Sequence, residues 1–343
     1  MSSNFDAFVK SLFTNLTLIL FNAGGLVKFS DWRCKMKRKV SVIGSGFVGT
    51  MTAQRIVEKN LADVVLLDIV EGLPQGKALD IMQSASVEGF DRQIIGSNDF
   101  ADTEHSDIVV FTAGFARTPG MSREELARKN GGIVRSVVET VARHAPACII
   151  IMVTNPLDVM THLAWKTSGF PAERVMGMGG ILDSSRYRVF LAEELNVSAG
   201  SIETMVLGSH GDSMVPVAAH TTAGGIQVSR LIDKQRLDAI IERTKNGGAE
   251  IVNLLKSGSA WHAPSSSAVA MVEAILGDTK KIFPVSAYLT GQYGIEDVHI
   301  GVPVKLGAAG IEEIYEIALS DEELEGLKRS AGAVSKTFDN LLI

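Results

Sequence analysis

A β-branched run that ends in three spaced glycines is the strongest constraint in this chain of 343 residues. Residues 40–43 read Val-Ser-Val-Ile, which is typical of a buried strand, and residues 44–49 read Gly-Ser-Gly-Phe-Val-Gly. Residues 50–59 have helical character, and a second apolar run at 64–67 ends in Asp68. A strand, a glycine-rich turn, a helix and a second strand in this order predict a βαβ unit.

Each part of this turn has a physical task in binding a dinucleotide. Gly44 permits the tight turn, Gly46 lets the backbone approach a pyrophosphate, and Gly49 lets the helix pack on the strand. A carboxylate at Asp68 accepts hydrogen bonds from ribose hydroxyls and repels a 2′-phosphate, so NAD is favoured over NADP. A glycine turn without a ligand is the alternative, but the order of the elements speaks against it. The predicted cofactor contacts here are Gly44, Ser45, Gly46, Phe47, Val48, Gly49 and Asp68.

The alternation of strands and helices continues through the first half. Strands are predicted at 92–96, 107–111 and 148–152, with helices at 71–88 and 123–144 between them. This order predicts an α/β fold with a doubly wound parallel sheet of the Rossmann type, whose ligand lies at the carboxyl ends of the strands.

The second half has a different pattern, which predicts an α+β substrate domain. Antiparallel strands are expected at 283–289 and 298–305, and residues 225–228 lie beside a hairpin turn. A final helix is expected at 320–342, with Ser320 and Glu323 as a capping box. We therefore expect a cofactor-binding domain at 36–155 and a catalytic domain at 156–343.

The first 35 residues do not match the rest of the chain. Residues 12–27 are largely apolar, but they are shorter than the ~20 residues of a usual membrane span and lack a positively charged region before them. We expect residues 1–35 to lie outside the fold, with Met36 as the true start. A disordered or loosely docked tail is the alternative.

Composition narrows the choice of partners and location. The net charge is −6, and no basic stripe is visible, so neither nucleic acid nor a membrane is an expected partner. The two cysteines form neither a disulfide framework nor a thiolate metal site. These features favour a protein of the reducing cytoplasm.

Polar residues in glycine-rich surroundings mark the second half as the place of chemistry. Asp183 and Arg186 are spaced i, i+3 at the start of an expected helix, so both project from one face. His210 stands in a tight loop between Gly208 and Gly211. Arg117 lies in the loop 115–122, which has the proline and glycine content of a mobile lid, and Arg123 follows it.

With these motifs the chain resembles the lactate/malate dehydrogenase family, and within it the malate dehydrogenases whose sequences are lactate-dehydrogenase-like. The resemblance runs from about Lys37 to the C-terminus. The motifs that carry it are residues 44–49, Asp68, and residues 113–123, 154–156, 182–186 and 208–212.

The resemblance implies a role for each polar residue. His210 is the expected acid/base and Asp183 the carboxylate that orients it. Arg186 is expected to bind the substrate C1 carboxylate, and Arg123 to polarise the reacting carbonyl. Asn155 is expected to contact substrate and, with Val153 and Thr154, the nicotinamide side of the cofactor. Asn130 is expected to be a further cofactor contact, and the role of His262 stays open.

Chemistry explains these residue types. Oxidation of a secondary alcohol removes a hydride, which NAD accepts, and a proton, which a histidine with a near-neutral pKa accepts. A histidine and the cofactor suffice, so no metal is expected.

Substrate choice is expected to depend on Arg117. In the family a glutamine at the lid position reads the methyl group of pyruvate, whereas an arginine reads a second carboxylate. Burial of either charge without its partner is costly, so Arg117 favours malate and oxaloacetate. The alternatives are an L-lactate dehydrogenase and a non-catalytic NAD-binding protein. The resemblance also implies a homodimer or homotetramer.

Overall fold

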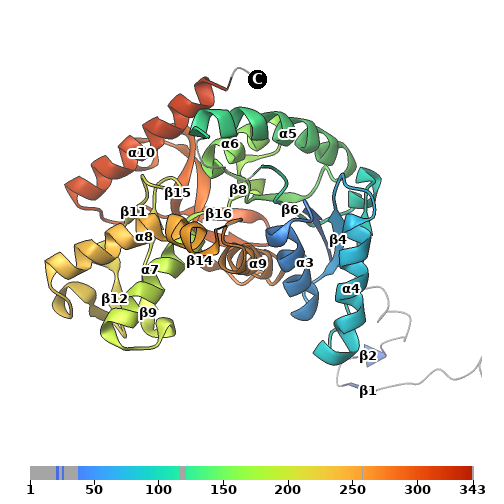
Figure 1. The fold of residues 1–343 in the computed structure, drawn as a ribbon, viewed down its shortest axis with the longest axis horizontal. Helices are drawn as coiled ribbons and strands as arrows, with labels where there is room; N and C mark the ends of the chain where they lie inside the picture. Colours follow the sequence, from blue (N-terminus) through green and yellow to red (C-terminus); the bar gives the residue numbers. More distant parts are fainter. Residues whose placement is uncertain (1–20, 23–24, 27–37, 116–120, 257, 342–343) are drawn as a thin grey trace, which may run out of the picture. The chain divides into compact units, whose positions relative to one another are not determined.

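The computed structural model describes residues 21–22, 25–26, 38–115, 121–256 and 258–341. The chain divides into two compact units, Met1–Lys37 and Arg38–Ile343. In the first unit, strands β1 (Phe21–Asn22) and β2 (Gly25–Leu26) pair in antiparallel fashion. The second unit holds every other element in the described part of the chain (Figure 1).

A nine-stranded sheet forms the centre of the second unit, in the order β16-β15-β14-β8-β7-β6-β3-β4-β5. The six strands β8, β7, β6, β3, β4 and β5 are parallel. From β3 the chain adds strands first on one side, as β4 and β5, and then on the other, as β6, β7 and β8, so the order reverses between β3 and β6. Such a reversal is the switch point where ligands bind in doubly wound folds, so the predicted Rossmann-type sheet is confirmed. The parallel strands are β3 (Lys39–Ile43), β4 (Asp63–Leu67), β5 (Ile94–Ser97), β6 (Ile108–Phe111), β7 (Ile149–Met152) and β8 (Val175–Gly177).

Three antiparallel strands extend this sheet: β14 (Lys281–Thr290), β15 (Glu296–Gly307) and β16 (Gly310–Ile314). The predicted strands at 283–289 and 298–305 are confirmed, and each is longer than expected. The strand β14 pairs with β8 at Ser286 and Gly177. A side chain at Gly177 would place its Cβ 2.8 Å from the Cβ of Ser286, so glycine permits this close approach. The strands of the second half therefore continue the sheet of the first.

Helices cover both faces of the sheet (Figure 1). On one face lie α3 (Phe47–Glu58), α4 (Leu73–Glu88) and α9 (His262–Leu276), and on the other lie α5 (Arg123–His144), α6 (Leu157–Ser168) and α10 (Asp321–Asp339). Helix α3 begins at Phe47 and not at residue 50, because the third glycine of the motif lies inside its first turn. The predicted capping box of Ser320 and Glu323 is present at the start of α10.

A smaller core lies between α7 (Gly180–Leu195) and α8 (Lys234–Leu255), which buries Tyr187, Leu191 and Ile240 among others. The predicted hairpin at 225–228 is formed by β12 (Thr222–Ala223) and β13 (Ile226–Gln227). The other short elements are η1 (Phe100–Thr103), η2 (Ala172–Arg174), η3 (Ala199–Ser201), β9 (Ile202–Glu203), β10 (Val206–Leu207), β11 (Val215–Pro216), η4 (Ala218–His220), η5 (Val228–Arg230) and η6 (Gln292–Gly294).

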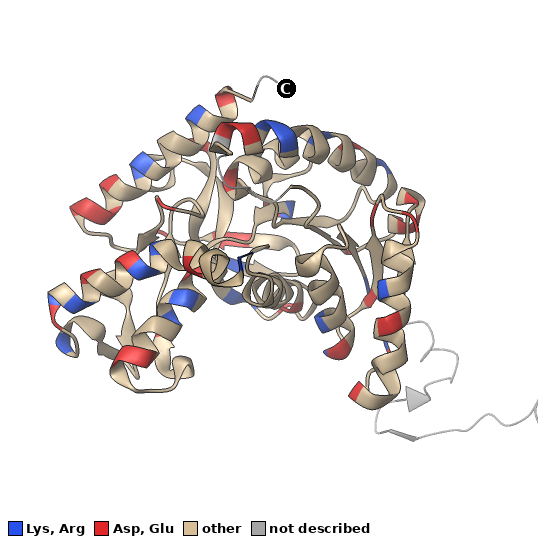
Figure 2. Ribbon diagram, viewed as in Figure 1, with Lys and Arg blue, Asp and Glu red and all other residues tan. Residues whose placement is uncertain are grey.

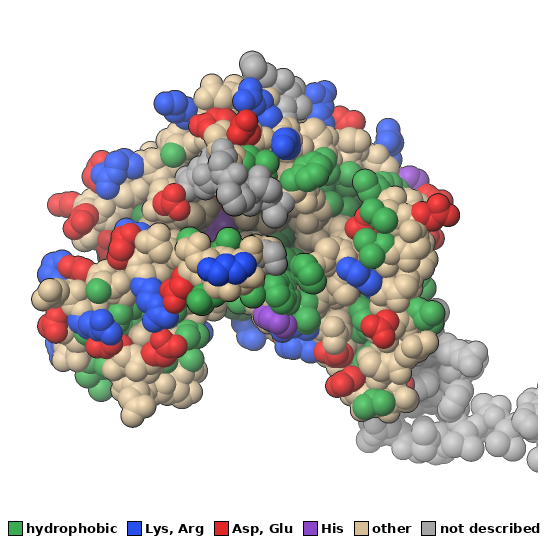
Figure 3. Space-filling view, viewed as in Figure 1, with side chains coloured by type: hydrophobic (Ala, Val, Ile, Leu, Met, Phe, Trp, Pro, Cys, Tyr) green, Lys and Arg blue, Asp and Glu red, His purple; other side chains and the backbone are tan. Residues whose placement is uncertain are grey.

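Charged side chains of both signs are interspersed over the helices and over the face seen in the space-filling view (Figures 2 and 3). Among the described residues, no helix combines the length and the apolar character that a membrane crossing requires.

Candidate active site

Two glycines of the predicted motif are required by the turn itself. Gly44 has a φ of +97°, and a Cβ there would lie 2.7 Å from the backbone nitrogen of Ala113. A Cβ on Gly49 would lie 1.8 Å from the carbonyl oxygen of Gly44. Gly46 is different, because none of the described atoms lies within 4 Å of the place its Cβ would take. The space beside Gly46 is open, as the approach of a ligand to the backbone requires.

The N-terminus of α3 opens at this turn. Gly46 is the N-cap residue and supplies no side-chain cap, so the first backbone amides of the helix are available to an anion. The ring of Phe47 is 68% exposed and stacks on Trp261, with 5.0 Å between the ring centroids. Val48 is half-buried. The turn therefore fits the pyrophosphate of a dinucleotide.

Asp68 follows the carboxyl end of β4 and is joined directly to the turn. Its Oδ2 accepts hydrogen bonds from the backbone nitrogen (2.6 Å) and the Oγ (2.8 Å) of Ser45. Its Oδ1 accepts one from the backbone nitrogen of Val70 at 3.1 Å. Burial opposes ionisation of this carboxyl, but the hydrogen bonds from Ser45 and Val70 outweigh burial and lower the pKa of Asp68. The carboxylate of Asp68 therefore keeps the charge that its predicted contact with ribose hydroxyls requires.

The structure brings His210, Asp183 and Arg186 into one cluster. The Nδ1 of His210 lies 2.9 Å from Oδ2 of Asp183. The other oxygen of Asp183 accepts a hydrogen bond from Nη1 of Arg186 at 3.2 Å. Asp183 is 1% exposed and lies in the first turn of α7. The i, i+3 spacing therefore places both residues on one helical face, as predicted.

Burial and charge act on His210 in opposite directions. Burial lowers the pKa of the imidazole, but the charge and the hydrogen bond of Asp183 outweigh burial, so the pKa of His210 is raised. Arg186 lowers this pKa and Asp158 raises it, each by a smaller effect. With Nδ1 held by Asp183, the Nε2 of His210 is the nitrogen that can exchange a proton with a substrate.

Glycines permit the close packing around His210. Gly208 and Gly211 on either side of the histidine loop have φ values of +81° and +139°. A Cβ on Gly179, just before α7, would lie 3.3 Å from the Cβ of His210. The loop and the start of α7 therefore meet closely enough for Asp183 to reach the imidazole.

Asn130 braces the loops that follow β6 and β7. Its side chain is fully buried; Oδ1 accepts from the backbone nitrogen of Phe115 at 2.8 Å, and Nδ2 donates to the carbonyl of Asn155 at 2.6 Å. Thr154 is buried and donates to the carbonyl of Ala113 at 2.7 Å, Val153 is half-buried, and Asn155 is exposed. The contacts of these residues with a cofactor stay predictions.

The structure says less about three other predicted site residues. Arg117 lies outside the described residues. Arg123 is the first residue of α5, and only its backbone is described. His262 is exposed at the start of α9, where its carbonyl oxygen accepts a hydrogen bond from Arg55 at 3.2 Å. The role of His262 therefore stays open.

Sequence reasoning missed two residues that support the site. Thr112 donates from Oγ1 to the carbonyls of Ile43 (2.9 Å) and Gly44 (3.1 Å), and so fastens the glycine turn to the end of β6. Its place directly after a predicted strand was the available signal. Asp158 binds the backbone of His210 at 2.9 Å, and the sequence carries no signal for this contact because the two residues are distant along the chain.

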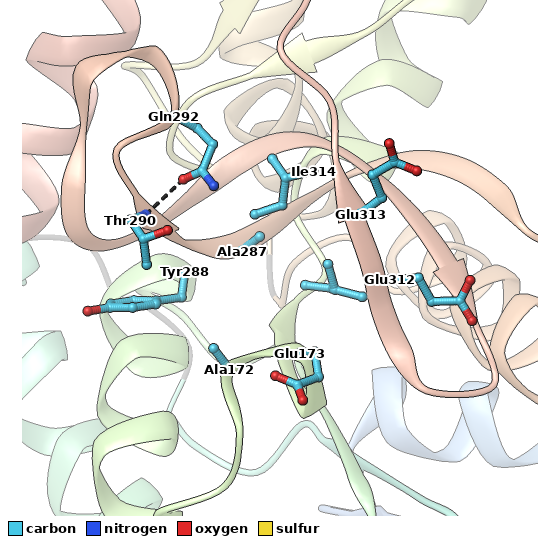
Figure 4. Close-up of a pocket in the computed structure, with 10 residues that line it drawn as sticks. Ala172, Glu173, Ala287, Tyr288, Thr290, Gln292, Glu312, Glu313 and Ile314 are labelled. Carbon is cyan, nitrogen blue, oxygen red and sulfur yellow. Dashed lines mark hydrogen bonds between the residues drawn. The ribbon is translucent and has the colours of Figure 1, made fainter.

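A pocket of about 300 Å³ lies elsewhere, at the antiparallel end of the sheet (Figure 4). It is lined by residues of η2, β14, η6 and β16, and none of them belongs to the His210 cluster. Two of its acidic side chains are paired with lysines, Glu312 with Lys280 and Glu313 with Lys305. We therefore place the candidate active site at the His210 cluster and the glycine turn, not at this pocket.

Comparison with known proteins agrees with this geometry. The family model for the lactate/malate dehydrogenase NAD binding domain matches residues 38–177, and the model for the alpha/beta C-terminal domain of the same family matches residues 181–341. A malate dehydrogenase of Roseiflexus castenholzii is 53% identical over 306 residues, which cover 89% of this chain and 99% of that protein.

Solved structures of two kinds are similar to this chain. The malate dehydrogenase of Cryptosporidium parvum has a TM-score of 0.88 and 41% identity, covering 89% of this chain and 99% of that one. The lactate dehydrogenase of the same organism, solved with lactic acid and β-nicotinamide adenine dinucleotide, has a TM-score of 0.87 and 41% identity, covering 89% and 98%. The fold alone therefore does not choose between the two substrates.

The parallel sheet, the glycine turn and the histidine–carboxylate pair define an NAD-dependent oxidoreductase. The chain belongs to the lactate/malate dehydrogenase family.

Proposed function

We propose that this chain catalyses the reversible oxidation of (S)-malate to oxaloacetate with NAD, a step of the tricarboxylic acid cycle. The observation that carries the reaction type is the contact of His210 Nδ1 with Asp183 Oδ2 at 2.9 Å, beside Arg186. The names of the relatives and the arginine at position 117 support malate as the substrate.

In the proposed reaction, His210 transfers the proton and Asp183 supports the histidine. Bound NAD supplies the acceptor for the hydride. In the oxidation, neutral His210 takes the hydroxyl proton at Nε2, and Asp183 stabilises the imidazolium that forms. In the reduction, the imidazolium returns that proton to the carbonyl oxygen. Asp183 fixes the ring orientation in both directions, because its Oδ2 holds Nδ1.

Arg186 is suited to bind the substrate C1 carboxylate. Its guanidinium lies against α8, where a Cβ on Gly247 would be 3.1 Å from its Cδ and a Cβ on Gly248 would be 3.6 Å from its Nη2. Gly247, in the middle of this helix, thus makes room for the Arg186 side chain, whose planar fork matches a carboxylate, whereas a Cβ on Gly248 would be in ordinary contact. Arg123 is proposed to polarise the carbonyl, and Arg117 to bind the second carboxylate.

Cofactor contacts are proposed at the carboxyl ends of the parallel strands. The open space at Gly46, the uncapped start of α3 and the ionised Asp68 support NAD binding by residues 44–49 and Asp68. Asn130, Val153, Thr154 and Asn155 are proposed on the nicotinamide side. Asn155 has the only exposed side chain of these last four in the described structure, so it is the one best placed to contact substrate.

Steady-state kinetics test the proposed substrate. Turnover of NADH is measured with oxaloacetate and with pyruvate, and we expect a higher kcat/KM for oxaloacetate. A higher value for pyruvate would favour a lactate dehydrogenase. Binding of NADH without reduction of any 2-oxo acid would favour a non-catalytic NAD-binding protein, although the intact His210 cluster speaks against that.

Assembly and location follow from the surface of the chain and its composition. A homodimer or homotetramer is proposed, and exposed apolar side chains on α4, such as Leu79 (61%) and Val87 (83%), support it. Light scattering after size-exclusion chromatography gives the subunit number. A cytoplasmic protein that binds neither nucleic acid nor a membrane is proposed, and the net charge of −6, the lack of a basic stripe in the sequence and the cysteine usage support it.

The proposed domain limits are 36–155 for the NAD-binding domain and 156–343 for the catalytic domain. Translation is proposed to begin at Met36, with residues 1–35 outside the fold. The intact mass of the native protein tests this start, and a mass that includes residues 1–35 would contradict it.

A further inference from the structure

His210 is held by two carboxyl groups from two different helices. Asp183 on α7 binds the ring at Nδ1, and Asp158 in the first turn of α6 accepts a hydrogen bond from the His210 backbone nitrogen at 2.9 Å. The proposed acid/base chemistry uses only the first of these groups. Asp158 is 3% exposed, so it is a buried carboxyl beside the reaction centre with no assigned role.

Asp158 also lies at a junction between segments of the site. Helix α6 begins at Leu157, directly after Asn155 and Pro156. The carbonyl oxygen of Asn155 accepts a hydrogen bond from Asn130. Three residues further on, Asp158 accepts a hydrogen bond from the His210 loop. The loop after β7 is therefore connected to the histidine loop through the first turn of α6 and the hydrogen bond of Asp158.

We propose that Asp158 is a positioning residue for the reaction, which fixes the main chain of the His210 loop so that the imidazole meets Asp183. This inference rests on the proposed dehydrogenase function of the same site. A single anchor at Nδ1 leaves the ring free to move with its loop, whereas a second anchor on the backbone removes that freedom. Displacements of about 1 Å at a reacting group can cost 10²-fold in rate.

The surroundings of Asp158 oppose its ionisation and raise its pKa. Its Oδ1 is buried without a hydrogen bond of good geometry, and so is the Oγ of Ser286 on β14. Burial raises the pKa of Asp158, and the charge of Asp183 acts in the same direction, while the Ser286 hydroxyl, the His210 amide and the His210 charge act against it. The carboxylate and the neutral acid both offer an oxygen to the His210 backbone, so the anchor does not depend on the charge of Asp158.

Two variants separate the position of the side chain from its charge. Asp158→Asn keeps an acceptor for the His210 backbone without a charge, whereas Asp158→Ala removes the acceptor. We expect kcat of Asp158→Asn to stay within about threefold of wild type and that of Asp158→Ala to fall about 10- to 100-fold, with NADH affinity unchanged in both. Thr161→Val, a buried change on the same helix, is the control that alters thermal stability but not kcat.

The pKa of His210, measured by NMR titration of the labelled ring, is the readout that needs no turnover. We expect it to change little in Asp158→Asn, because Asp158 acts on the His210 pKa less than Asp183 does. A fall of the His210 pKa in Asp158→Asn as large as that in Asp183→Asn would show that Asp158 acts through its charge, and would overturn the positioning role. Wild-type kcat in Asp158→Ala, or an equal loss in both variants, would overturn the positioning role.

If Asp158→Ala does not fold, the kcat and the His210 titration of Asp158→Asn test the positioning role. Absence of 2-oxo acid reduction by the wild-type protein would contradict the proposed function, and the titration would still test Asp158.

Discussion

The Nδ1 of His210 lies 2.9 Å from Oδ2 of Asp183, although 27 positions separate the two residues along the chain. The contact depends on the N-terminal turn of α7, which holds the buried side chain of Asp183 against the histidine loop. One hydrogen bond thus selects the ring tautomer, orients the ring and raises its pKa.

Loss of this carboxylate should therefore affect both rate and pH dependence. We expect Asp183→Asn to lower kcat by about 10²- to 10⁴-fold. The pKa of His210 is raised in the wild type, so kcat/KM for reduction should fall as the pH rises through that raised value, and for oxidation it should fall as the pH drops below it. In Asp183→Asn both limbs should move to lower pH. Unchanged limbs would show that Asp183 does not control the titration of His210.

Two glycines of one motif should respond differently to the same substitution. Gly49→Ala places a Cβ 1.8 Å from the carbonyl oxygen of Gly44, so we expect a loss of stability of several degrees in Tm. Gly46→Ala meets open space in the free protein, so its Tm should be close to wild type while its affinity for NADH falls. Thermal unfolding and fluorescence titration check the pair. Unchanged NADH affinity in Gly46→Ala would contradict the proposed pyrophosphate position.

Arg117 should decide the substrate. We expect Arg117→Gln to shift the ratio of kcat/KM for oxaloacetate and pyruvate toward pyruvate by at least about tenfold, because a charged pair is lost with one substrate and a buried unpaired charge is removed with the other. Arg128→Gln, on the exposed surface of α5, serves as the control. An unchanged ratio in Arg117→Gln would refute this role.

A buried histidine pair should make the fold sensitive to acid. The Nδ1 atoms of His162 and His299 lie 3.2 Å apart, and both side chains are buried. Burial lowers the pKa of His162 to about 4 and that of His299 well below its ordinary value, so the native state stays neutral where the unfolded chain takes up protons. The free energy of unfolding should thus fall as the pH drops from about 6.5 to about 4, by about 3 kcal/mol for His162 alone.

Chemical unfolding at a series of pH values checks this expectation. His162→Gln removes one titrating group, so the loss of stability toward acid should become smaller. His220→Gln, at an exposed histidine, should keep the wild-type slope. An equal slope in all three proteins would show that the buried pair is not the cause.

The sequence predicts much of the fold because its first half is locally regular. Runs such as 108–111 and 149–152 are buried at every position, and a continuous apolar run indicates a central parallel strand. The order of the strands and the attachment of β14 to β8 depend on contacts between distant segments, which no local pattern contains. Helix α3 begins at Phe47 and not at the predicted residue 50, and no local pattern marks that start.

The candidate site divides along a similar line. His210, Asp183 and Arg186 are predicted by their motifs, and their contacts are as expected. The brace formed by Asn130 and the anchor formed by Asp158 were not predicted, because each acts on backbone atoms of a distant loop. Side chains that bind main-chain groups leave no spacing pattern by which a sequence can reveal them.

The pairing of β14 with β8 has a consequence for dissection of the molecule. A fragment ending near Gly177 would leave β8 as an open edge, with its unpaired backbone groups and apolar side chains in water. Such an edge recruits other strands, so the isolated cofactor half should aggregate unless the missing hairpin is supplied. The two halves of this protein are therefore poor candidates for exchange with other proteins as independent modules, and a chimera would have to carry β14 and β15 together with β8.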